Sequence, residues 1–236
     1  MAPRVLIILP AYNEEETIGI VLDQIISKTS YRDILVINDG SIDHTSREAC
    51  KRSVTVLELP FNLGVGAAVQ AGYMYARDHK YACVVRVDAD GQHDVSHIDE
   101  LLAPILAERA DITIGSRVLG TSGYSSSFPR RVGIRILTAL VSRIVGQRIE
   151  DTTSGFRANN SRVTAAFADY YPDDYPEVES IIWANRMGFR IEEVRVRMER
   201  RMGGESSITA VRSIYYMTKV ILAVMIELLR KTDSHK

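Results

Sequence analysis

Two carboxylates separated by one residue, Asp88 and Asp90, follow an apolar stretch of the chain. In an extended segment, residues two apart project to the same side, so these carboxylates would lie together. Left alone they would repel, and one would take up a proton. A divalent cation such as Mg²⁺ or Mn²⁺ removes this conflict, because both ions prefer oxygen ligands. The pair therefore predicts a metal site, to which Gln92 could add an oxygen and, for Mn²⁺, His93 a nitrogen.

The alternative for this pair is an acidic turn that caps the following helix, since Asp94 and Ser96 are good capping residues. Three further polar clusters also follow apolar stretches, at 11–14, 38–40 and 116–117. Each of them could be ordinary turn chemistry. In a doubly wound sheet, however, ligands bind at the carboxyl ends of the strands. Four such clusters in succession favour a ligand site over packing alone.

The elements that must position these clusters alternate between strand and helix. Continuous apolar runs predict buried strands, and apolar residues at helical spacing predict helices. We expect strands at 5–9 (ended by Pro10), 34–37, 54–59, 81–87 and 111–116. We expect helices at 14–26, 64–77 and 98–107, and one more helix that starts after a cap at Asp43 or Thr45. This order predicts an α/β fold with a mostly parallel, doubly wound central sheet flanked by helices.

The remainder of the chain is less regular. After a loop at 120–127, a helix is expected at 133–145, a polar irregular segment at 152–160 and a half-exposed strand at 191–197. A loop at 200–207 then leads into an amphipathic C-terminal helix at 208–230. We therefore expect a catalytic domain over 1–207, followed by this helix and tail over 208–236.

Composition limits the class of protein. The chain has 236 residues, enough for one domain, with 46% hydrophobic and 25% charged residues. These values exclude a disordered or polytopic membrane protein. The net charge of −1, from 29 basic and 30 acidic residues, argues against a nucleic-acid partner. We expect no signal peptide, and we interpret Cys50 and Cys83 as reduced packing residues of a cytosolic protein.

The charge is unevenly distributed along the chain. Residues 112–149 contain no acidic residue but carry six arginines: Arg117, Arg130, Arg131, Arg135, Arg143 and Arg148. A nucleoside diphosphate, an anionic acceptor or an anionic bilayer explains this block better than a solvated face does. The 208–230 helix either docks on the core or lies in the bilayer interface, and we favour attachment to a membrane surface or a small membrane-protein partner. No uncharged apolar stretch is long enough to span a bilayer.

Six motifs occur in an order that carries a resemblance. They are Pro10-Ala11-Tyr12-Asn13-Glu14, Asn38-Asp39-Gly40-Ser41, Asn62-x-Gly64, Asp88-Ala89-Asp90-x-Gln92-His93, Gly115-Ser116-Arg117 and Asp151-x-x-Ser154-Gly155-Phe156-Arg157. On these motifs the sequence resembles glycosyltransferase family 2, which has the GT-A fold. It is most similar to the branch of dolichyl-phosphate mannose synthases and polyprenyl-phosphate glycosyltransferases.

The resemblance implies roles for the residues in these motifs. Those implied to bind the nucleotide sugar are Pro10, Tyr12, Glu14, Ile37, Asp39, Asp88, Ala89, Arg117 and Arg200. Asp88 and Asp90 would hold the metal and the donor's diphosphate, with Gln92 as a further metal ligand. Arg117 matches an arginine that grips phosphate, and Arg200 one on a loop that closes over the site. Arg131 and Arg200 are candidates for the acceptor phosphate.

The leading hypothesis is a metal-dependent, inverting glycosyltransferase at the cytoplasmic face of the membrane, bound peripherally. It would move a sugar from a UDP- or GDP-linked donor to undecaprenyl or dolichyl phosphate, with Asp90 and Arg117 catalytic. If the acceptor is instead a glycan hydroxyl, Asp151 would take its proton, unless Asp151 only caps a turn. A homo-oligomer is compatible with the sequence. A non-catalytic membrane scaffold is disfavoured, because the carboxylates and Arg117 are intact.

Overall fold

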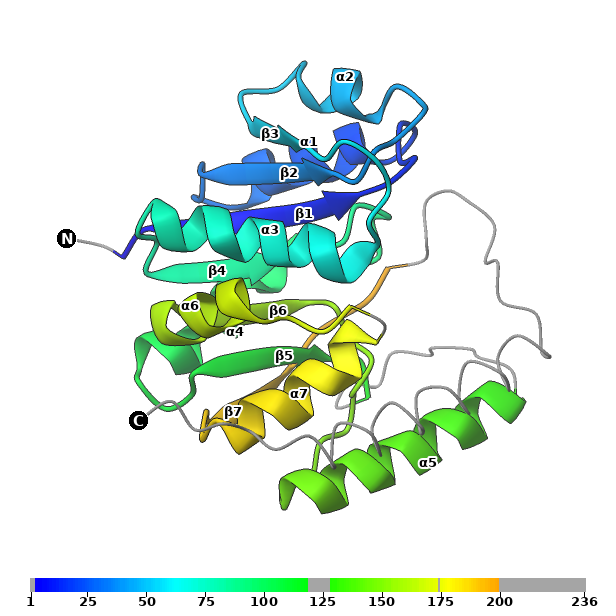
Figure 1. Cartoon of the computed structure of the whole chain (residues 1–236), viewed down its shortest axis with the longest axis vertical. Helices are drawn as coiled ribbons and strands as arrows, with labels where there is room; N and C mark the ends of the chain where they lie inside the picture. Colours follow the sequence, from blue (N-terminus) through cyan, green and yellow to red (C-terminus); the bar gives the residue numbers. More distant parts are fainter. Residues whose placement is uncertain (1–2, 119–127, 174, 200–236) are drawn as a thin grey trace.

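A computed structural model describes residues 3–118, 128–173 and 175–199 of the chain (Figure 1). Its centre is a seven-stranded sheet in the order β3-β2-β1-β4-β6-β5-β7. The strands are β1 (Val5–Ala11), β2 (Ile34–Asn38), β3 (Thr55–Glu58), β4 (Cys83–Arg86), β5 (Ile112–Ser116), β6 (Arg157–Asn160) and β7 (Ile191–Arg195). All neighbouring pairs are parallel except those of β6, which runs antiparallel to both β4 and β5. The predicted mostly parallel α/β sheet is confirmed.

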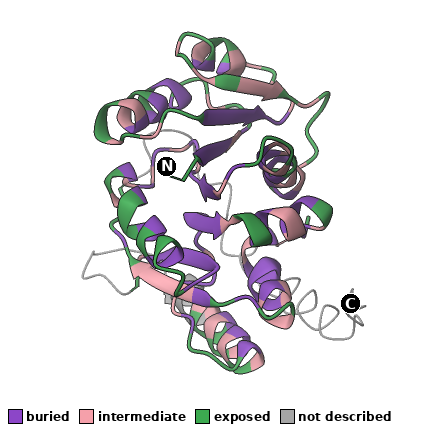
Figure 2. Cartoon of the chain, turned by 90° about the vertical axis from the view of Figure 1, so that its left-hand side faces the viewer, coloured by how far each residue is buried: buried purple, intermediate pink, exposed green. Residues whose placement is uncertain are grey.

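Helices cover both faces of the sheet and create two hydrophobic cores. The helices are α1 (Ile18–Lys28), α2 (Thr45–Ala49), α3 (Val65–Asp78), α4 (Ile98–Leu106), α5 (Phe128–Val145), α6 (Ser161–Asp169) and α7 (Pro176–Arg186), with a 3₁₀ turn at Val95–His97. One core joins the sheet to α3, α5, α6 and α7, and the other joins it to α1, α2 and α4. The central strands are buried between these layers, whereas the edge strands β3 and β7 and the outer faces of the helices are more exposed (Figure 2).

Strand β1 shows how a continuous apolar run serves both cores. Its side chains alternate, so that Leu6 and Ile8 face the core with α3, whereas Ile7 and Leu9 face the core with α1. The strand continues through Pro10 to Ala11, two residues beyond its expected end. Proline lacks only the N–H donor, and the carbonyl of Ala11 still accepts a hydrogen bond from Asp39 N at 2.9 Å.

The expectation of an irregular segment over 152–160 is wrong for its last four residues, which form β6. The polarity of these residues gave no sign of a strand, although Arg157 and Asn159 are buried and donate hydrogen bonds within the fold. Arg157 donates to the Ser154 carbonyl oxygen and the Ser180 hydroxyl, and the Asn159 amide donates to the Tyr73 hydroxyl. The expectations for this part of the chain also omitted α6 and α7.

Other boundaries differ less. Helix α5 starts at Phe128, five residues before its expected start. The Asp43 carboxylate accepts the Thr45 N–H and so supports the start of α2. Cys83 is buried as expected, but Cys50 is exposed and is therefore no packing residue. The expected loops at 120–127 and 200–207 and the helix at 208–230 lie outside the described residues. Within the described ranges, no helix combines the length and apolar character needed to cross a membrane.

Candidate active site at the carboxyl edge of the sheet

The polar clusters predicted from the sequence meet at one edge of the sheet. Strands β1, β2, β4 and β5 share one direction, so their carboxyl ends lie along the same edge (Figure 1). Tyr12 follows β1, Asp39 follows β2, Asp88 lies two residues after β4, and Arg117 follows β5. The expectation of a shared edge is thus confirmed. The antiparallel β6 begins at this edge and places the 151–157 segment there as well.

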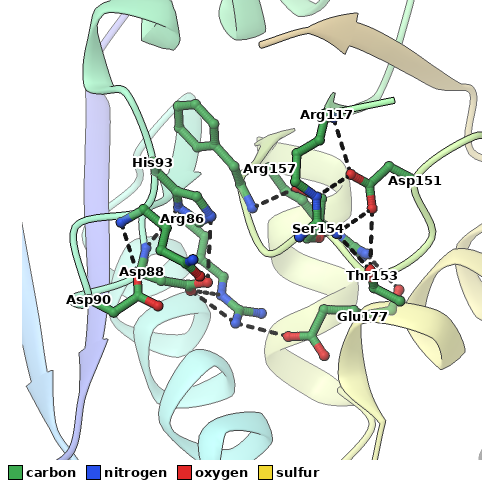
Figure 3. A network of polar contacts seen from close by, with 12 residues as sticks. Arg86, Asp88, Asp90, His93, Arg117, Asp151, Thr153, Ser154, Arg157 and Glu177 are labelled. Atoms are coloured by element: carbon green, nitrogen blue, oxygen red, sulfur yellow. Dashed lines mark hydrogen bonds and ion pairs between the residues drawn. The ribbon is translucent and has the colours of Figure 1, made fainter. Parts of the chain in front are cut away.

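Asp88 is held by a buried arginine from its own strand. Arg86 Nε and Nη2 both lie 3.1 Å from Asp88 Oδ1, and Nη2 lies 2.9 Å from Oε1 of Glu177, at the start of α7 (Figure 3). The Arg86 side chain is only 3% exposed. Burial alone would raise the pKa of Asp88, but the charge of Arg86 outweighs it and lowers the pKa. Asp88 is therefore an ionised carboxylate with a fixed orientation.

His93 supports the same carboxylate from the other side. Its Nδ1 accepts the backbone N–H of Asp88 at 3.0 Å, and its Nε2 lies 3.6 Å from Asp88 Oδ2. The ring stacks on Phe156, with centroids 4.8 Å apart. Burial lowers the pKa of His93, so the neutral ring carries its proton on Nε2. With Nδ1 engaged and Nε2 protonated, His93 orients Asp88 in this arrangement, and the suggestion that it ligates Mn²⁺ does not fit.

Gly155 leaves room beside Asp88. A Cβ atom at this position would lie 2.6 Å from Asp88 Oδ2 and 3.0 Å from Arg86 Nη2. Real side chains do not tolerate so short a contact, so any larger residue would displace the carboxylate. The Ser154-Gly155-Phe156 motif thus shapes the space around the first carboxylate of the Asp88-Ala89-Asp90 turn.

The donor set at this turn suits a hard divalent cation. Asp90 Oδ1 accepts the Gln92 N–H at 3.0 Å, which curls the turn so that Asp88, Asp90 and Gln92 lie on one short loop, each half-buried. The described residues contain no cluster of three or more His, Cys, Asp or Glu side chains arranged for a metal. Two carboxylates with substrate phosphate oxygens are the usual way in which proteins hold Mg²⁺. The residues present therefore fit an ion shared with a phosphorylated ligand.

Arg117 and Asp151 form the second half of the site. Asp151 Oδ2 accepts from Arg117 Nε at 2.6 Å, Oδ1 accepts from Nη2 at 2.7 Å, and the Arg117 backbone N–H adds a bond of 3.1 Å. Thr153 Oγ1 accepts a further bond from Nη2 at 2.7 Å. Asp151 is 1% exposed. Burial would raise its pKa, but Arg117 lowers it overall, so Asp151 is a weak base in this arrangement.

The 151–157 segment joins the two halves (Figure 3). Its first residues contact Arg117, Gly155 packs on Asp88, and Arg157 binds the Ser180 hydroxyl and the Glu177 carbonyl oxygen of α7. After β7 the chain also passes the Asp88-Ala89-Asp90 turn. There Met198 pairs with His93 in an isolated bridge, and the Glu199 N–H donates to the Gln92 carbonyl oxygen at 2.8 Å.

The residues expected to hold the nucleoside lie at the other end of the same edge. Tyr12 is 44% exposed, and Pro10 is half-buried in β1. Glu14 Oε2 accepts the Thr17 hydroxyl at 2.7 Å. Asp39 is buried, with its two oxygens accepting the Leu63 and Gly64 N–H groups at 2.8 and 2.9 Å. Asp39 therefore anchors the loop before α3, and its contact with a nucleoside stays a prediction.

Four further residues were expected to contact a ligand: two have buried side chains, and the side chains of the other two lie outside the described structure. The side chains of Ile37 and Ala89 are buried in the two cores, and Ile37 Cδ1 packs beside Gly72 of α3. Only the backbones of these two residues remain for the predicted donor pocket, so side-chain contacts from them do not fit. Arg131 belongs to α5, but its side chain lies outside the described part of the structure, as does Arg200 entirely.

The sequence reasoning missed three charged residues that build the site. Arg86 had a usable signal, because a charged residue inside a strand buried on both faces requires a partner. Glu177, which pairs with Arg86, and Glu193, which accepts the Asp151 N–H, had none. Glu177 is one of many acidic residues near a helix start, and Glu193 stands beside Glu192 in an alternating strand. Only the tertiary structure distinguishes them from solvent-exposed carboxylates.

Comparison with known proteins agrees with this geometry. The sequence model of glycosyl transferase family 2 matches residues 6–167. The chain is 32% identical over 222 residues to an undecaprenyl-phosphate mannosyltransferase of Micrococcus luteus, covering 87% of this chain and 88% of that protein. It is 30% identical over 223 residues to a polyprenol monophosphomannose synthase of Mycolicibacterium smegmatis, covering 87% of this chain and 81% of that protein.

Solved structures show the same fold. Glucosyl-3-phosphoglycerate synthase from Mycobacterium tuberculosis, crystallised with Mn²⁺, UDP and phosphoglyceric acid, superposes with a TM-score of 0.73. The match covers 96% of this chain and 78% of that chain at 20% identity, a similarity that concerns the fold. Together with the family match and the relatives above, it shows that the chain belongs to glycosyl transferase family 2 and is a glycosyltransferase with a GT-A type fold.

Proposed function

We propose that this enzyme transfers a sugar from a UDP- or GDP-linked donor to polyprenyl phosphate, with inversion at the anomeric carbon. Residues 1–207 would form the catalytic domain. Asp88, Asp90 and Gln92 would hold Mg²⁺ or Mn²⁺, which stabilises negative charge on the departing nucleoside diphosphate. Two relatives named for undecaprenyl-phosphate and polyprenol acceptors support this acceptor class. The Mn²⁺ and UDP in the structural neighbour support the donor and the ion.

Our choice between the two acceptor classes rests on the hydrogen bonds that Asp151 accepts from Arg117. A hydroxyl acceptor needs a base to take its proton, and Asp151 was the candidate. Its two oxygens instead accept three hydrogen bonds from Arg117, and its pKa is lowered. A phosphate monoester is already anionic near neutral pH. It can attack without a base, so the arrangement favours a lipid phosphate over a glycan hydroxyl.

The chemical step is a single displacement. A phosphate oxygen of the acceptor forms a bond to the anomeric carbon, and the bond from that carbon to the donor's diphosphate oxygen breaks. The electron pair of the broken bond leaves with the nucleoside diphosphate, and no proton has to move. Arg117 would contribute its positive charge and guanidinium donors to a phosphate group. Tyr12, Glu14 and the Asp39 loop would receive the nucleoside.

We also place the enzyme peripherally at the cytoplasmic membrane face, on a membrane surface or a small membrane-protein partner. The acceptor is a lipid, which supports this location. In addition, Arg135 and Arg143 are exposed on α5, and Arg148 is exposed just after it, in a stretch without acidic residues. Exposed arginines attract anionic headgroups.

A product assay tests the function. The full chain is incubated with Mn²⁺, a panel of UDP- and GDP-sugars, and either a short polyprenyl phosphate, the matching polyprenol or an oligosaccharide. We expect a glycosyl phosphodiester of the lipid, identified by mass spectrometry, with the phosphate acceptor only. Product from the oligosaccharide alone would support the glycan alternative. Absence of any product with every donor, from protein that binds a nucleotide, would favour a non-catalytic role.

A further inference from the structure

A carboxylate on β7 lies directly behind the Arg117–Asp151 pair. Glu193 Oε2 accepts the backbone N–H of Glu150 at 2.7 Å, and Oε1 accepts that of Asp151 at 2.8 Å. One side chain therefore binds two consecutive amides, which fixes the peptide that leads into Asp151. Burial raises the pKa of Glu193, so the fold places this carboxyl where its charge is disfavoured.

Asp151 passes this constraint on to Arg117. Its two oxygens take the Nε and Nη2 edge of the guanidinium, and Thr153 takes a second bond from Nη2. Bonds along one edge of a planar fork set the plane of the whole group, and hence the direction in which its other edge points. Glu193 lies on β7, paired with Ile114 of β5, the strand that Arg117 follows. We call the contacts from Glu193 through Asp151 to Arg117 the relay. Its two ends lie on, or directly after, adjacent strands.

We propose that Glu193 is a positioning residue that orients the Arg117 guanidinium, through Asp151, for binding phosphate. The proposal rests on the proposed function, in which Arg117 binds a phosphate group of the substrates. Hydrogen bonds from a guanidinium group lie in its plane, so the plane decides whether Arg117 can reach a phosphate oxygen, and a displacement of about 1 Å can reduce a rate by up to two orders of magnitude. The competing explanation is that Glu193 only braces the turn at 150–151.

Glu193→Gln is the informative variant. Glutamine has the same shape but only one acceptor oxygen, so it can satisfy only one of the two amides. Glu192→Gln is the matched control, because Glu192 is the preceding residue of β7 and pairs with the exposed Arg109. We expect Glu193→Gln to reduce kcat/KM by about tenfold or more at a temperature well below its Tm. Glu192→Gln should stay within about twofold of the wild type.

A double variant separates positioning from bracing. If Glu193 acts through Arg117, then adding Glu193→Gln to Arg117→Lys should reduce kcat/KM no further than Arg117→Lys alone, because residues of one network are not additive. Losses that simply multiply would overturn the proposal. So would a Glu193→Gln enzyme with a lower Tm but wild-type kcat/KM. If this variant does not fold, Glu193→Asp takes its place. Its carboxylate is one methylene shorter and cannot bind both amides unless they move, so wild-type kcat/KM in that variant would equally overturn the proposal.

A spectroscopic readout keeps this test independent of the proposed activity. The Arg117 Nε–H, bonded to buried Asp151, should give a slowly exchanging ¹H–¹⁵N signal, assigned by its loss in Arg117→Lys. We expect Glu193→Gln to shift that signal and speed its exchange with solvent, and Glu192→Gln to leave it unchanged. If no donor and acceptor pair gives product while the signal responds, the proposed function fails and the relay stands. An unchanged signal in Glu193→Gln overturns the relay whatever the activity.

Discussion

Asp88 and Asp90 are chemically identical but differ in how the fold holds them. Asp88 is fixed by Arg86, by His93 and by the absence of a side chain at Gly155. The Asp90 carboxylate accepts the Gln92 N–H within the same turn. Because Arg86 partly neutralises the negative charge of Asp88, we expect Asp90 to contribute more to the attraction for a cation.

Asp90→Asn therefore tests the metal assignment. The change removes a negative charge but leaves the size of the side chain unaltered. We expect the Mn²⁺-dependent affinity for UDP or GDP, measured by calorimetry, to fall more than about tenfold, a loss seen even for residues one layer behind metal ligands. Asp99→Asn, at an exposed position on α4 that bonds Tyr31, is the control. Unchanged affinity in Asp90→Asn would mean that the ion binds elsewhere.

Gly155→Ala tests the space beside Asp88. The added Cβ would lie 2.6 Å from Asp88 Oδ2, so the carboxylate must move. We expect weaker Mn²⁺-dependent nucleotide binding in a protein that remains folded. Gly19→Ala is a suitable control, because its Cβ would meet only the flexible end of the Arg52 side chain. Equal nucleotide affinity in the two variants would show that the position of Asp88 is not critical.

Among the elements, β6 does most to assemble the site. It is antiparallel to its neighbours, so it starts at the edge where β4 and β5 end. The preceding 151–157 segment can therefore contact Arg117 at one end and Asp88 at the other. A parallel strand in this place would have delivered its carboxyl end to the edge and carried those residues away.

At the opposite edge of the sheet, Asp111, which directly precedes β5, links neighbouring strands by hydrogen bonds. Its carboxylate accepts bonds from Arg190 N and Nε at 2.9 and 3.0 Å and from the Asn160 amide at 2.8 Å, so it links β5, β6 and β7. The bonds from Arg190 lower the pKa of Asp111 to about 2. A carboxyl whose pKa is lowered on folding stabilises the protein above its unfolded pKa of about 4, and that stability disappears as the pH falls toward 2.

Asp111→Asn should thus destabilise the protein in a pH-dependent way. At pH 7 we expect Tm to fall by about 3 °C or more. The difference from the wild type should shrink as the pH is lowered from 4 and vanish near 2, as followed by circular dichroism. Asp169→Asn removes a partner of the exposed Arg77 and should have little effect, since surface pairs contribute little. A difference that stays constant with pH would contradict the assigned pKa.

On the scale of the whole molecule, the net charge of −1 conceals two different surfaces. The segment after β1, where we propose that the nucleoside binds, carries Glu14, Glu15 and Glu16, whereas the β5–α5 side carries arginines without acidic neighbours in sequence. An acceptor with an anionic head would approach the second surface, near Arg117. This asymmetry agrees with a site that binds a cation and a nucleotide at one end and a lipid phosphate at the other.

Removal of residues 209–236 tests the proposed membrane attachment. These residues lie outside the described structure, and their sequence predicts an amphipathic helix. We expect the truncated protein to lose flotation with anionic liposomes but to retain nucleotide binding, because the proposed nucleotide site lies within 1–207. Flotation at the wild-type level would assign attachment to the arginines of α5 instead. Flotation of neither protein would favour a membrane-protein partner.

Much of the first half of the fold was predictable, because its strands are buried on both faces and read as continuous apolar runs. The carboxyl-edge residues Asp88, Asp90 and Arg117 were predictable too, since each follows such a run. The β6 strand was not, because Arg157 and Asn159 are polar yet buried. Their partners, Ser180 and Tyr73, lie far away in sequence, and only folding brings them together.

The sequence by itself determined the class of fold, the family and the residue types at the site, because strand periodicity and motif spacing are local properties of the chain. The tertiary structure alone decided how those residues are charged and oriented. It paired Arg86 with Asp88, turned Asp151 from a candidate base into the partner of Arg117, and placed Glu193 behind both. These outcomes depend on burial and on distances between strands that are remote in sequence, and such quantities exist only once the sheet has formed.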